Sequence, residues 1–290
     1  MKEQQVEVNG IKLQVREYEH EGETIFFLHY GSGNLMMWQG VVPYFQDAYR
    51  MVLIDLRGHG KSDSPQDGYH IDQMAADVAG VMEHLGLTRA HVVGSSLGAE
   101  VGLSLAANYP DKVVSLVCEG ALYSEYGPYG IRNTSEGTFR EEVARKLAKI
   151  RETPETVYAT AEELVTATRQ DWEQDGFWNT NLEAVVRYGI HEIATGEYTH
   201  SWRKWARERY LTHYYTYRFE EYYRRVACPV LMLPAEDEME NEEMRKAMEG
   251  FSQLARSCKI VLVPGAVHAG GWMLFPQRMS EAVLDFLAEV

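Results

Sequence analysis

Short apolar runs recur along the chain, separated by segments whose apolar residues follow a helical period. The runs are almost continuously apolar rather than alternating, which is typical of strands buried on both faces. They occupy residues 25–28, 51–54, 91–93, 113–117, 229–233 and 259–263. Amphipathic helices are predicted at 75–85, 97–107 and 278–287. This order predicts an α/β fold, with a mostly parallel central sheet and helices on both faces.

The interval 122–227 differs from the rest of the chain, because it lacks such runs and holds 19 of the 33 aromatic residues. Helices are predicted there at 139–151, 155–172 and 182–195. We expect a helical cap at 122–227, inserted into a core domain made of residues 1–121 and 228–290. The tyrosine-rich tract 213–225 is interpreted either as a helix or arm that pins the cap down or as an aromatic wall over a substrate pocket.

Composition excludes several classes of protein. With 45% hydrophobic and 24% charged residues among 290, the chain is not disordered throughout. Its net charge of −15 argues against nucleic acid or an anionic membrane as a partner. No apolar run approaches the roughly 18 residues of a membrane span. The charged and amide side chains of the first five residues are unlike a signal peptide, so we expect a cytoplasmic protein that acts on a small molecule.

The three cysteines do not indicate a disulfide framework or a metal site. Cys118, Cys228 and Cys258 are far apart, form no CxxC pair and lie in or beside apolar stretches. They are expected to be small buried apolar residues.

A G-x-S-x-G motif provides the first candidate chemistry. It spans Gly94 to Gly98, follows the strand at 91–93 and opens the helix at 97–107. In this context the serine, Ser96, is expected on a sharp strand-to-helix turn with its Oγ exposed. The free amides at the start of the helix point toward an anion that forms there, and the amide of Leu97 is one of them.

A serine nucleophile needs a base, and the base needs an acid that orients it. Of ten histidines, only His268 lies just past the last predicted strand, at the sheet edge where parallel strands place their site. Three histidines in the insertion are expected to be structural or to line a pocket: His191, His200 and His213. The acid is expected after the preceding strand, where 236–243 offers several carboxylates.

An acyl-transfer site also needs hydrogen-bond donors for the oxyanion. Besides Leu97, the glycine-containing loop 29–33 is the expected source, because glycines let backbone amides approach a substrate closely.

Together these residues resemble the α/β-hydrolase superfamily over about 6–121 and 228–290. The loop 29–33 resembles the family's H-G-x-x-G loop, and 55–62 is similar to its structural D-x-R-G-x-G-x-S turn. The resemblance implies an eight-stranded sheet with a helical cap after the sixth strand, and His268 as the base. Counting from His29 to Trp38, as in relatives with this spacing, implies Gly31 as the second oxyanion donor.

Two positions depart from the family pattern. Tyr30 replaces the second glycine of the loop, and Ala235 replaces the glycine of the family's G-x-x-D acid loop. That alignment makes Glu238 the expected acid. Asp237, the commoner residue type, and Glu119, at a place where some relatives carry the acid, remain the alternatives.

We expect a serine hydrolase that cleaves a carboxylic ester or a related small acyl compound. The expected residues are Ser96, His268 and Glu238, with Gly31 and Leu97 as the oxyanion hole. No cofactor or metal is expected, because the chain has no HExxH, CxxC or GxxxxGK[ST] motif. Alternatives that use the same residues are a carbon–carbon bond hydrolase, a lactonase, a cofactor-free peroxidase-like enzyme and a slow small-molecule receptor.

Overall fold

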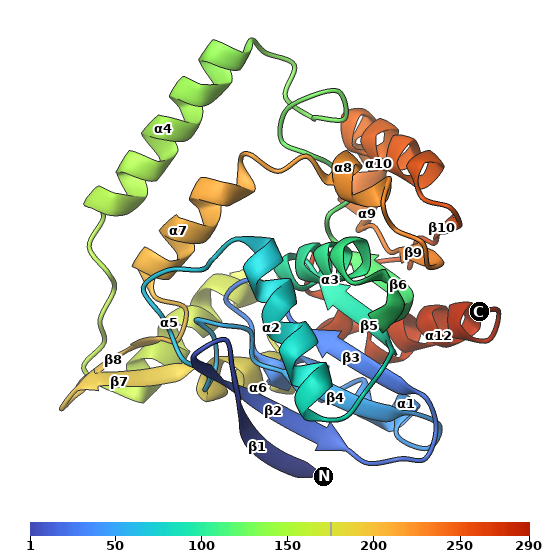
Figure 1. Ribbon diagram of the computed structural model, residues 1–290. Coiled ribbons are helices and arrows are strands. Elements are labelled where there is room, and N and C mark those ends of the chain that lie inside the picture. The colour runs from blue at the N-terminus through green and yellow to red at the C-terminus, as the bar shows by residue number, and fades with distance from the viewer. Residues whose placement is uncertain (175) are drawn as a thin grey trace.

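The computed structural model describes residues 1–174 and 176–290. Its main sheet has eight strands in the order β1-β2-β4-β3-β5-β6-β9-β10, with helices on both faces (Figure 1). The strands are β1 (Lys2–Val8), β2 (Ile11–Tyr18), β3 (Thr24–Leu28), β4 (Arg50–Ile54), β5 (Ala90–Ser95), β6 (Val113–Glu119), β9 (Val230–Met232) and β10 (Cys258–Ile260). From β4 to β10 every neighbouring pair is parallel. The predicted fold class is confirmed, and a strand is present at each of the six predicted places, although the last one ends at Ile260 instead of residue 263.

The strands of the parallel region are buried on both sides, which explains their continuous apolar sequences. In β3, for example, all five residues are buried. Phe26 and Leu28 pack on one face with α2 (Ile71–His84), α3 (Leu97–Asn108) and α10 (Glu242–Leu254). Phe27 packs on the other face with η1 (Leu35–Trp38), α1 (Val42–Phe45), α11 (Gly271–Leu274) and α12 (Pro276–Leu287). Two further short helices lie outside the insertion, η2 (Pro110–Lys112) and α9 (Glu236–Glu240).

The sequence prediction missed the antiparallel strands β1 and β2 at the sheet edge. β1 alternates buried and exposed positions and carries mostly polar residues, so it has no apolar run. The turn between the two strands is Asn9-Gly10, and both residues have positive φ, 50° and 76°. An Asn-Gly pair is favoured at such hairpin turns.

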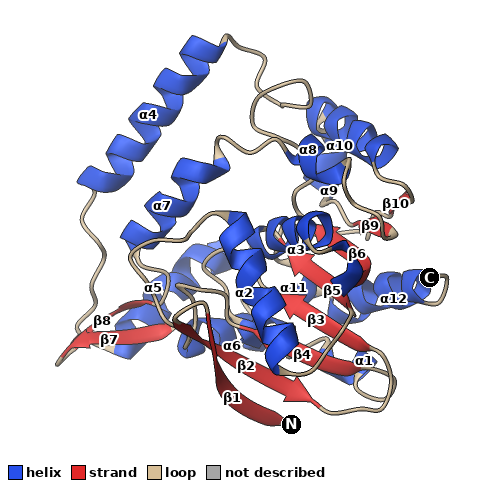
Figure 2. Cartoon of the chain, in the orientation of Figure 1, coloured by secondary structure: helices blue, strands red, loops and turns tan. Residues whose placement is uncertain are grey.

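The insertion between β6 and β9 is helical in most of its length but also contains a hairpin (Figure 2). Its elements are α4 (Glu136–Glu152), α5 (Ala161–Gln174), α6 (Thr180–Tyr188), β7 (Ile190–Ala194), β8 (Glu197–His200), α7 (Lys204–Tyr214) and α8 (Phe219–Tyr223). The prediction of one helix over 182–195 is therefore wrong, because Gly189 ends α6 and a two-stranded sheet follows. Figure 1 shows α4 as the part of the insertion farthest from the main sheet.

Predictions from the sequence also concern membrane-spanning helices and the state of the cysteines. No helix within the described residues is long and apolar enough to cross a membrane. All three cysteines are free; Cys118 and Cys228 are buried as expected, whereas Cys258 is half-buried.

The turn that follows β4 holds the sheet to α2 through a buried ion pair. Arg57 donates from Nε and Nη2 to the two carboxylate oxygens of Asp77, at 2.6 and 2.7 Å. Both side chains are less than 5% exposed. The Asn9 side-chain Nδ2 also donates to Asp77 Oδ1, at 2.8 Å, so the same carboxylate holds the β1–β2 turn in place.

Replacing Asp77 with asparagine is expected to lower the free energy of unfolding by about 3–5 kcal/mol, because the buried Arg57 guanidinium loses its counter-charge. Urea denaturation measures this. Asp285→Asn, at an exposed position of α12, is the control and should stay close to the parent protein. Equal losses in the two variants would contradict the structural role of the ion pair.

Candidate active site

The G-x-S-x-G motif forms the predicted sharp turn between β5 and α3. Ser96 has φ 50° and ψ −115°, a conformation that costs energy for a residue with a side chain. The flanking glycines are required by close packing. A Cβ at Gly94 would lie 2.4 Å from the Gly98 carbonyl oxygen, and one at Gly98 would lie 2.0 Å from that of Leu28.

The end of β6 lies directly against this turn. The Ser96 amide donates to the Glu119 carbonyl oxygen at 2.5 Å. Gly120 follows with φ 134°, and a Cβ there would lie 2.6 Å from the Ser96 Cα. The backbone that supports the serine therefore also fixes the position of Glu119.

His268 lies within hydrogen-bond distance of the serine. Its Nε2 is 3.0 Å from the Ser96 Oγ, although 172 residues separate the two in sequence. The imidazole belongs to the loop after β10, and 42% of the side chain is exposed. The next residue, Ala269, has φ 58°, so the loop bends sharply just after the histidine. The predicted base and the predicted nucleophile are thus in contact, in the arrangement that serine activation requires.

Two carboxylates contact the other nitrogen of the same imidazole. Glu119 Oε1 and Glu238 Oε1 are each 3.3 Å from His268 Nδ1, and both side chains are nearly buried. Glu119 comes from the end of β6 and Glu238 from α9. Asp237 is exposed and does not contact the histidine. The predicted residue Glu238 and one of its two alternatives therefore converge on His268.

The two carboxylates differ in their remaining hydrogen bonds. Glu119 Oε1 also accepts the Ala269 amide at 2.8 Å, and its Oε2 accepts the Ser95 hydroxyl at 2.5 Å. Glu238 Oε2 accepts the Ala235 amide at 2.9 Å. Glu119 is therefore held from three directions. Glu238 Oε1 has the His268 nitrogen as its partner among the described residues.

These charges shift the titration of the histidine. Burial by itself lowers the pKa of the His268 imidazole, but the negative charges of Glu119 and Glu238 outweigh it and raise the pKa to about 9. Burial also raises the pKa of the Glu119 carboxyl. The two neighbouring carboxylates thus favour the protonated form of the His268 imidazole, and burial favours the protonated form of Glu119.

The predicted oxyanion donors lie at the two expected places. Leu97 is the first residue of α3, so its amide has no acceptor within the helix. Gly31 lies in the loop after β3, and its amide has no protein acceptor among the described residues. A Cβ at Gly31 would lie 2.6 Å from the Trp202 ring, which explains the glycine there. Tyr30 is tolerated because its side chain is buried and lines a pocket under the insertion.

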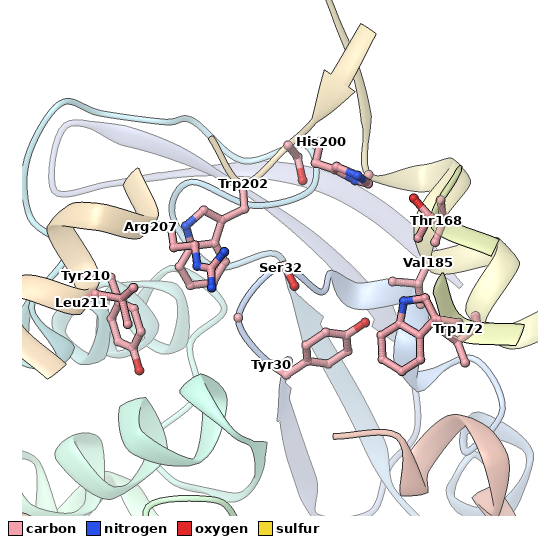
Figure 3. A pocket seen from close by; sticks show the side chains of 15 residues that line it. Tyr30, Ser32, Thr168, Trp172, Val185, His200, Trp202, Arg207, Tyr210 and Leu211 are labelled. Carbon is pink, nitrogen blue, oxygen red and sulfur yellow. The ribbon is translucent and has the colours of Figure 1, made fainter. Parts of the chain in front are cut away.

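Two adjoining cavities lie between the core and the insertion. The serine cavity, of about 130 Å³, is lined by Ser96, His268 and Glu238 among others. The cap pocket, of about 510 Å³, lies over Gly31 and extends between α5, α6 and α7 (Figure 3). Tyr210 and Leu211 of α7 line both cavities and form the wall between them.

The histidines of the insertion have the non-catalytic positions expected of them. His191 contacts the Gly60 carbonyl oxygen at 2.8 Å, and His213 packs edge-on against His70. His200 lines the cap pocket.

The tract 213–225 both anchors the insertion and lines a cavity. Tyr223 donates to the Ala121 carbonyl and packs into the core, which anchors the insertion. Tyr214 and Phe219 line the serine cavity.

Glu100 is a buried carboxyl one helical turn after Ser96, and it lines the serine cavity. It was not predicted from the sequence. The Tyr210 hydroxyl lies 2.9 Å from both of its oxygens. Burial raises the pKa of Glu100 to about 8. The sequence does contain a signal for a buried carboxyl at this position, because Glu100 is the one charged residue in the apolar stretch 97–107.

Comparison with known proteins agrees with this architecture. The model of a family described as "alpha/beta hydrolase fold" matches residues 23–239. A 2-(acetamidomethylene)succinate hydrolase of Mesorhizobium japonicum is 37% identical over 39% of this chain and 40% of its own length. The 3-oxoadipate enol-lactonase 2 of Acinetobacter baylyi is 42% identical over 27% of this chain and 30% of its own. The matched segment thus spans well under half the length of these curated relatives.

Solved structures extend the similarity of fold to nearly the whole chain. A crystal structure of E-2-(acetamidomethylene)succinate hydrolase superposes with a TM-score of 0.78 at 24% identity, covering 99% of this chain and 98% of that one. A thermophilic esterase from Thermogutta terrifontis gives a TM-score of 0.71 at 19% identity, with 100% and 99% coverage.

Gly120→Ala is expected to destabilise the protein more than Gly86→Ala. Both glycines have positive φ, so each substitution carries a conformational cost of about 1–2 kcal/mol. A Cβ at Gly86 meets nothing within 4 Å, whereas one at Gly120 collides with the Ser96 backbone. Thermal denaturation of the two variants compares them directly. A smaller loss for Gly120→Ala would show that the contact between β6 and the serine turn is not tight.

Proposed function

The chain belongs to the alpha/beta hydrolase fold family, and from that premise we propose that it is a serine hydrolase that cleaves a carboxylic ester or a related small acyl compound. The observation that carries the proposal is the 3.0 Å contact between His268 Nε2 and the Ser96 Oγ, on a strained turn that opens into a cavity. In this proposal residues 122–227 are the cap that closes the site over a core made of 1–121 and 228–290.

The proposed reaction proceeds in two halves. The Ser96 Oγ attacks the carbonyl carbon while His268 Nε2 takes the hydroxyl proton. The negative charge moves to the carbonyl oxygen, where the amides of Gly31 and Leu97 donate to it. The tetrahedral intermediate then expels the alcohol, which receives the proton from His268, and an acyl-enzyme remains. Water activated by the same histidine releases the acid and restores the serine.

We assign the role of triad acid to Glu238. Its Oε1 is available to the His268 Nδ1–H, whereas Glu119 Oε1 already accepts the Ala269 amide and its Oε2 accepts Ser95. Glu119 then acts as a second, positioning carboxylate. It holds the histidine loop in place through Ala269 and adds negative charge beside the imidazolium that forms during attack.

The alternatives share the same residues. A lactonase, a carbon–carbon bond hydrolase and a peroxidase-like enzyme differ in substrate rather than in the triad, and a receptor would turn over slowly. An aspartate nucleophile, which dehalogenases and epoxide hydrolases of this fold use, is replaced here by Ser96. A panel of short p-nitrophenyl esters separates enzyme from receptor. Turnover favours the enzyme, whereas a ligand-induced rise in Tm without turnover favours the receptor.

Ser96→Ala is expected to lower the rate of ester hydrolysis by several orders of magnitude, because the hydroxyl is the attacking group. The protein should stay folded. Release of p-nitrophenol and thermal denaturation measure the two effects. Ser95→Ala is the matched control. It removes the neighbouring hydroxyl that donates to Glu119 but leaves the nucleophile in place, so hydrolysis should persist. Near-parental turnover by Ser96→Ala would rule out the serine mechanism.

The pH profile of kcat/KM should rise through a midpoint well above the value of about 6.5 of an isolated histidine. The pKa of His268 is raised to about 9, and only the neutral imidazole can accept the serine proton. Glu238→Gln and Glu119→Gln should each shift the midpoint to lower pH, because each removes a negative charge beside the ring.

The same two variants separate the roles of the carboxylates. Glu238→Gln should lower kcat by about 10²–10⁴-fold, because the amide stabilises the wrong imidazole tautomer. Glu119→Gln should lower kcat less, and the exposed Asp237→Asn serves as the control. A larger fall in kcat for Glu119→Gln than for Glu238→Gln would make Glu119 the triad acid.

A further inference from the structure

The cap pocket carries a positive charge that the proposed chemistry does not use. Among its described lining residues, Arg207 is the one side chain that is fully charged at neutral pH. No aspartate or glutamate lines the pocket. Burial lowers the pKa of His200, the other basic residue there, so its ring is neutral. Figure 3 shows Arg207 beside Trp202, on the side of the pocket formed by α7.

Arg207 has no carboxylate partner within the described residues, unlike two nearby arginines, one just before α7 and one within it. Arg203 binds the Glu155 carboxylate through two nitrogens. Arg209 lies 3.5 Å from Asp67 and stacks over Trp205. In a chain with a net charge of −15, carboxylates are abundant, so an arginine at a pocket without one is available to an external anion.

The neighbouring serine cavity has titratable groups instead of a permanent cation, and His268 is one of them. Glu100 and Glu238 line it, and no lysine or arginine does so among the described residues. The two cavities meet at Tyr210 and Leu211. The cap pocket therefore offers a permanent positive charge with no carboxylate among its described lining residues, and this favours a substrate whose charged end lies there.

The volume and the lining residues of the cap pocket indicate what kind of group the rest of that substrate is. A volume of about 510 Å³ holds a ring-sized group, and Trp172, Val185 and Trp202 supply apolar and aromatic surface. Hydroxyls are contributed by Ser32 and Thr168. The pocket thus suits an apolar spacer that ends in an anion.

We propose that the substrate is an amphipathic monoanion whose carboxylate pairs with the Arg207 guanidinium in the cap pocket while its acyl carbon lies at Ser96. Arg207 is an exposed residue at the pocket, and its planar guanidinium fork matches the two oxygens of a carboxylate. This inference rests on the proposed function for the position of the acyl carbon, whereas the anion site itself is independent of catalysis.

Matched pairs of esters test the proposal. In one pair the charge is on the alcohol side, 4-acetoxybenzoate against its neutral isostere 4-acetoxybenzamide. In the other it is on the acyl side, phenyl hydrogen glutarate against phenyl glutaramate. The parent protein should prefer the anion in at least one pair, after subtraction of the uncatalysed rate, and that pair identifies which half of the substrate occupies the cap pocket.

Arg207→Gln should lower the ratio of kcat/KM for the anionic over the neutral ester by about two- to fivefold, mainly through KM, because the guanidinium is exposed. Arg207→Glu should lower it further. Arg209→Gln, two residues away on α7 and outside the lining of the cap pocket, should leave the ratio unchanged. The proposal is overturned if the parent protein prefers the neutral ester in both pairs, or if Arg207→Gln and Arg209→Gln give the same ratio.

A binding measurement separates the anion site from the hydrolase assignment. In Ser96→Ala, the quenching of tryptophan fluorescence by 4-acetoxybenzoate reports on Trp172 and Trp202, which line the pocket. Introducing Arg207→Gln into the Ser96→Ala variant should weaken this binding about two- to fivefold and reduce its dependence on salt. If no ester is hydrolysed but this difference persists, the proposed function fails and the anion site stands. Equal binding of the anion with and without Arg207 overturns the anion site.

Discussion

The contact between the end of β6 and the serine turn is the constraint on which the site depends. The Ser96 amide donates to the Glu119 carbonyl, and glycine at position 120 is needed because a Cβ would collide with the Ser96 backbone. The contact supports a backbone conformation that a serine does not otherwise favour. It also leaves the Glu119 carboxylate beside the histidine that faces the serine. The backbone support of the proposed nucleophile and the negative charge beside the proposed base therefore arise from one short segment of backbone.

The convergence of two glutamates on one imidazole has an electrostatic consequence. Each is 3.3 Å from His268 Nδ1 and nearly buried, so neither charge is well screened by water. Together they raise the pKa of the imidazole, and burial raises that of Glu119. The protons of the three groups are coupled, and a pH profile reports the cluster rather than one residue. A change at Glu119 is thus expected to act through His268 even though Glu119 does not reach the serine.

The parts of the fold predicted from sequence are those with local signals. The strands of the parallel region read as apolar runs because both of their faces are buried, and the turn at Ser96 is marked by glycines that packing requires. β1 was missed because its alternating pattern contains mostly polar residues, and β7 because an apolar residue every few positions resembles a helix. Glu119 was one of the candidate acids, but its contact with His268 alongside Glu238 could not be derived. Spacing within one loop does not reveal that a distant strand end reaches the same nitrogen.

The most direct test of the account is the detection of the covalent intermediate on Ser96. The protein is mixed with p-nitrophenyl acetate, quenched in acid within the first turnover and digested, and the peptide containing residues 94–98 is analysed by mass spectrometry. The account predicts one acetyl group on Ser96, formed in step with the first equivalent of p-nitrophenol and absent from Ser96→Ala. Release of p-nitrophenol with no acetylated peptide, or with the acetyl group on another residue, would contradict it.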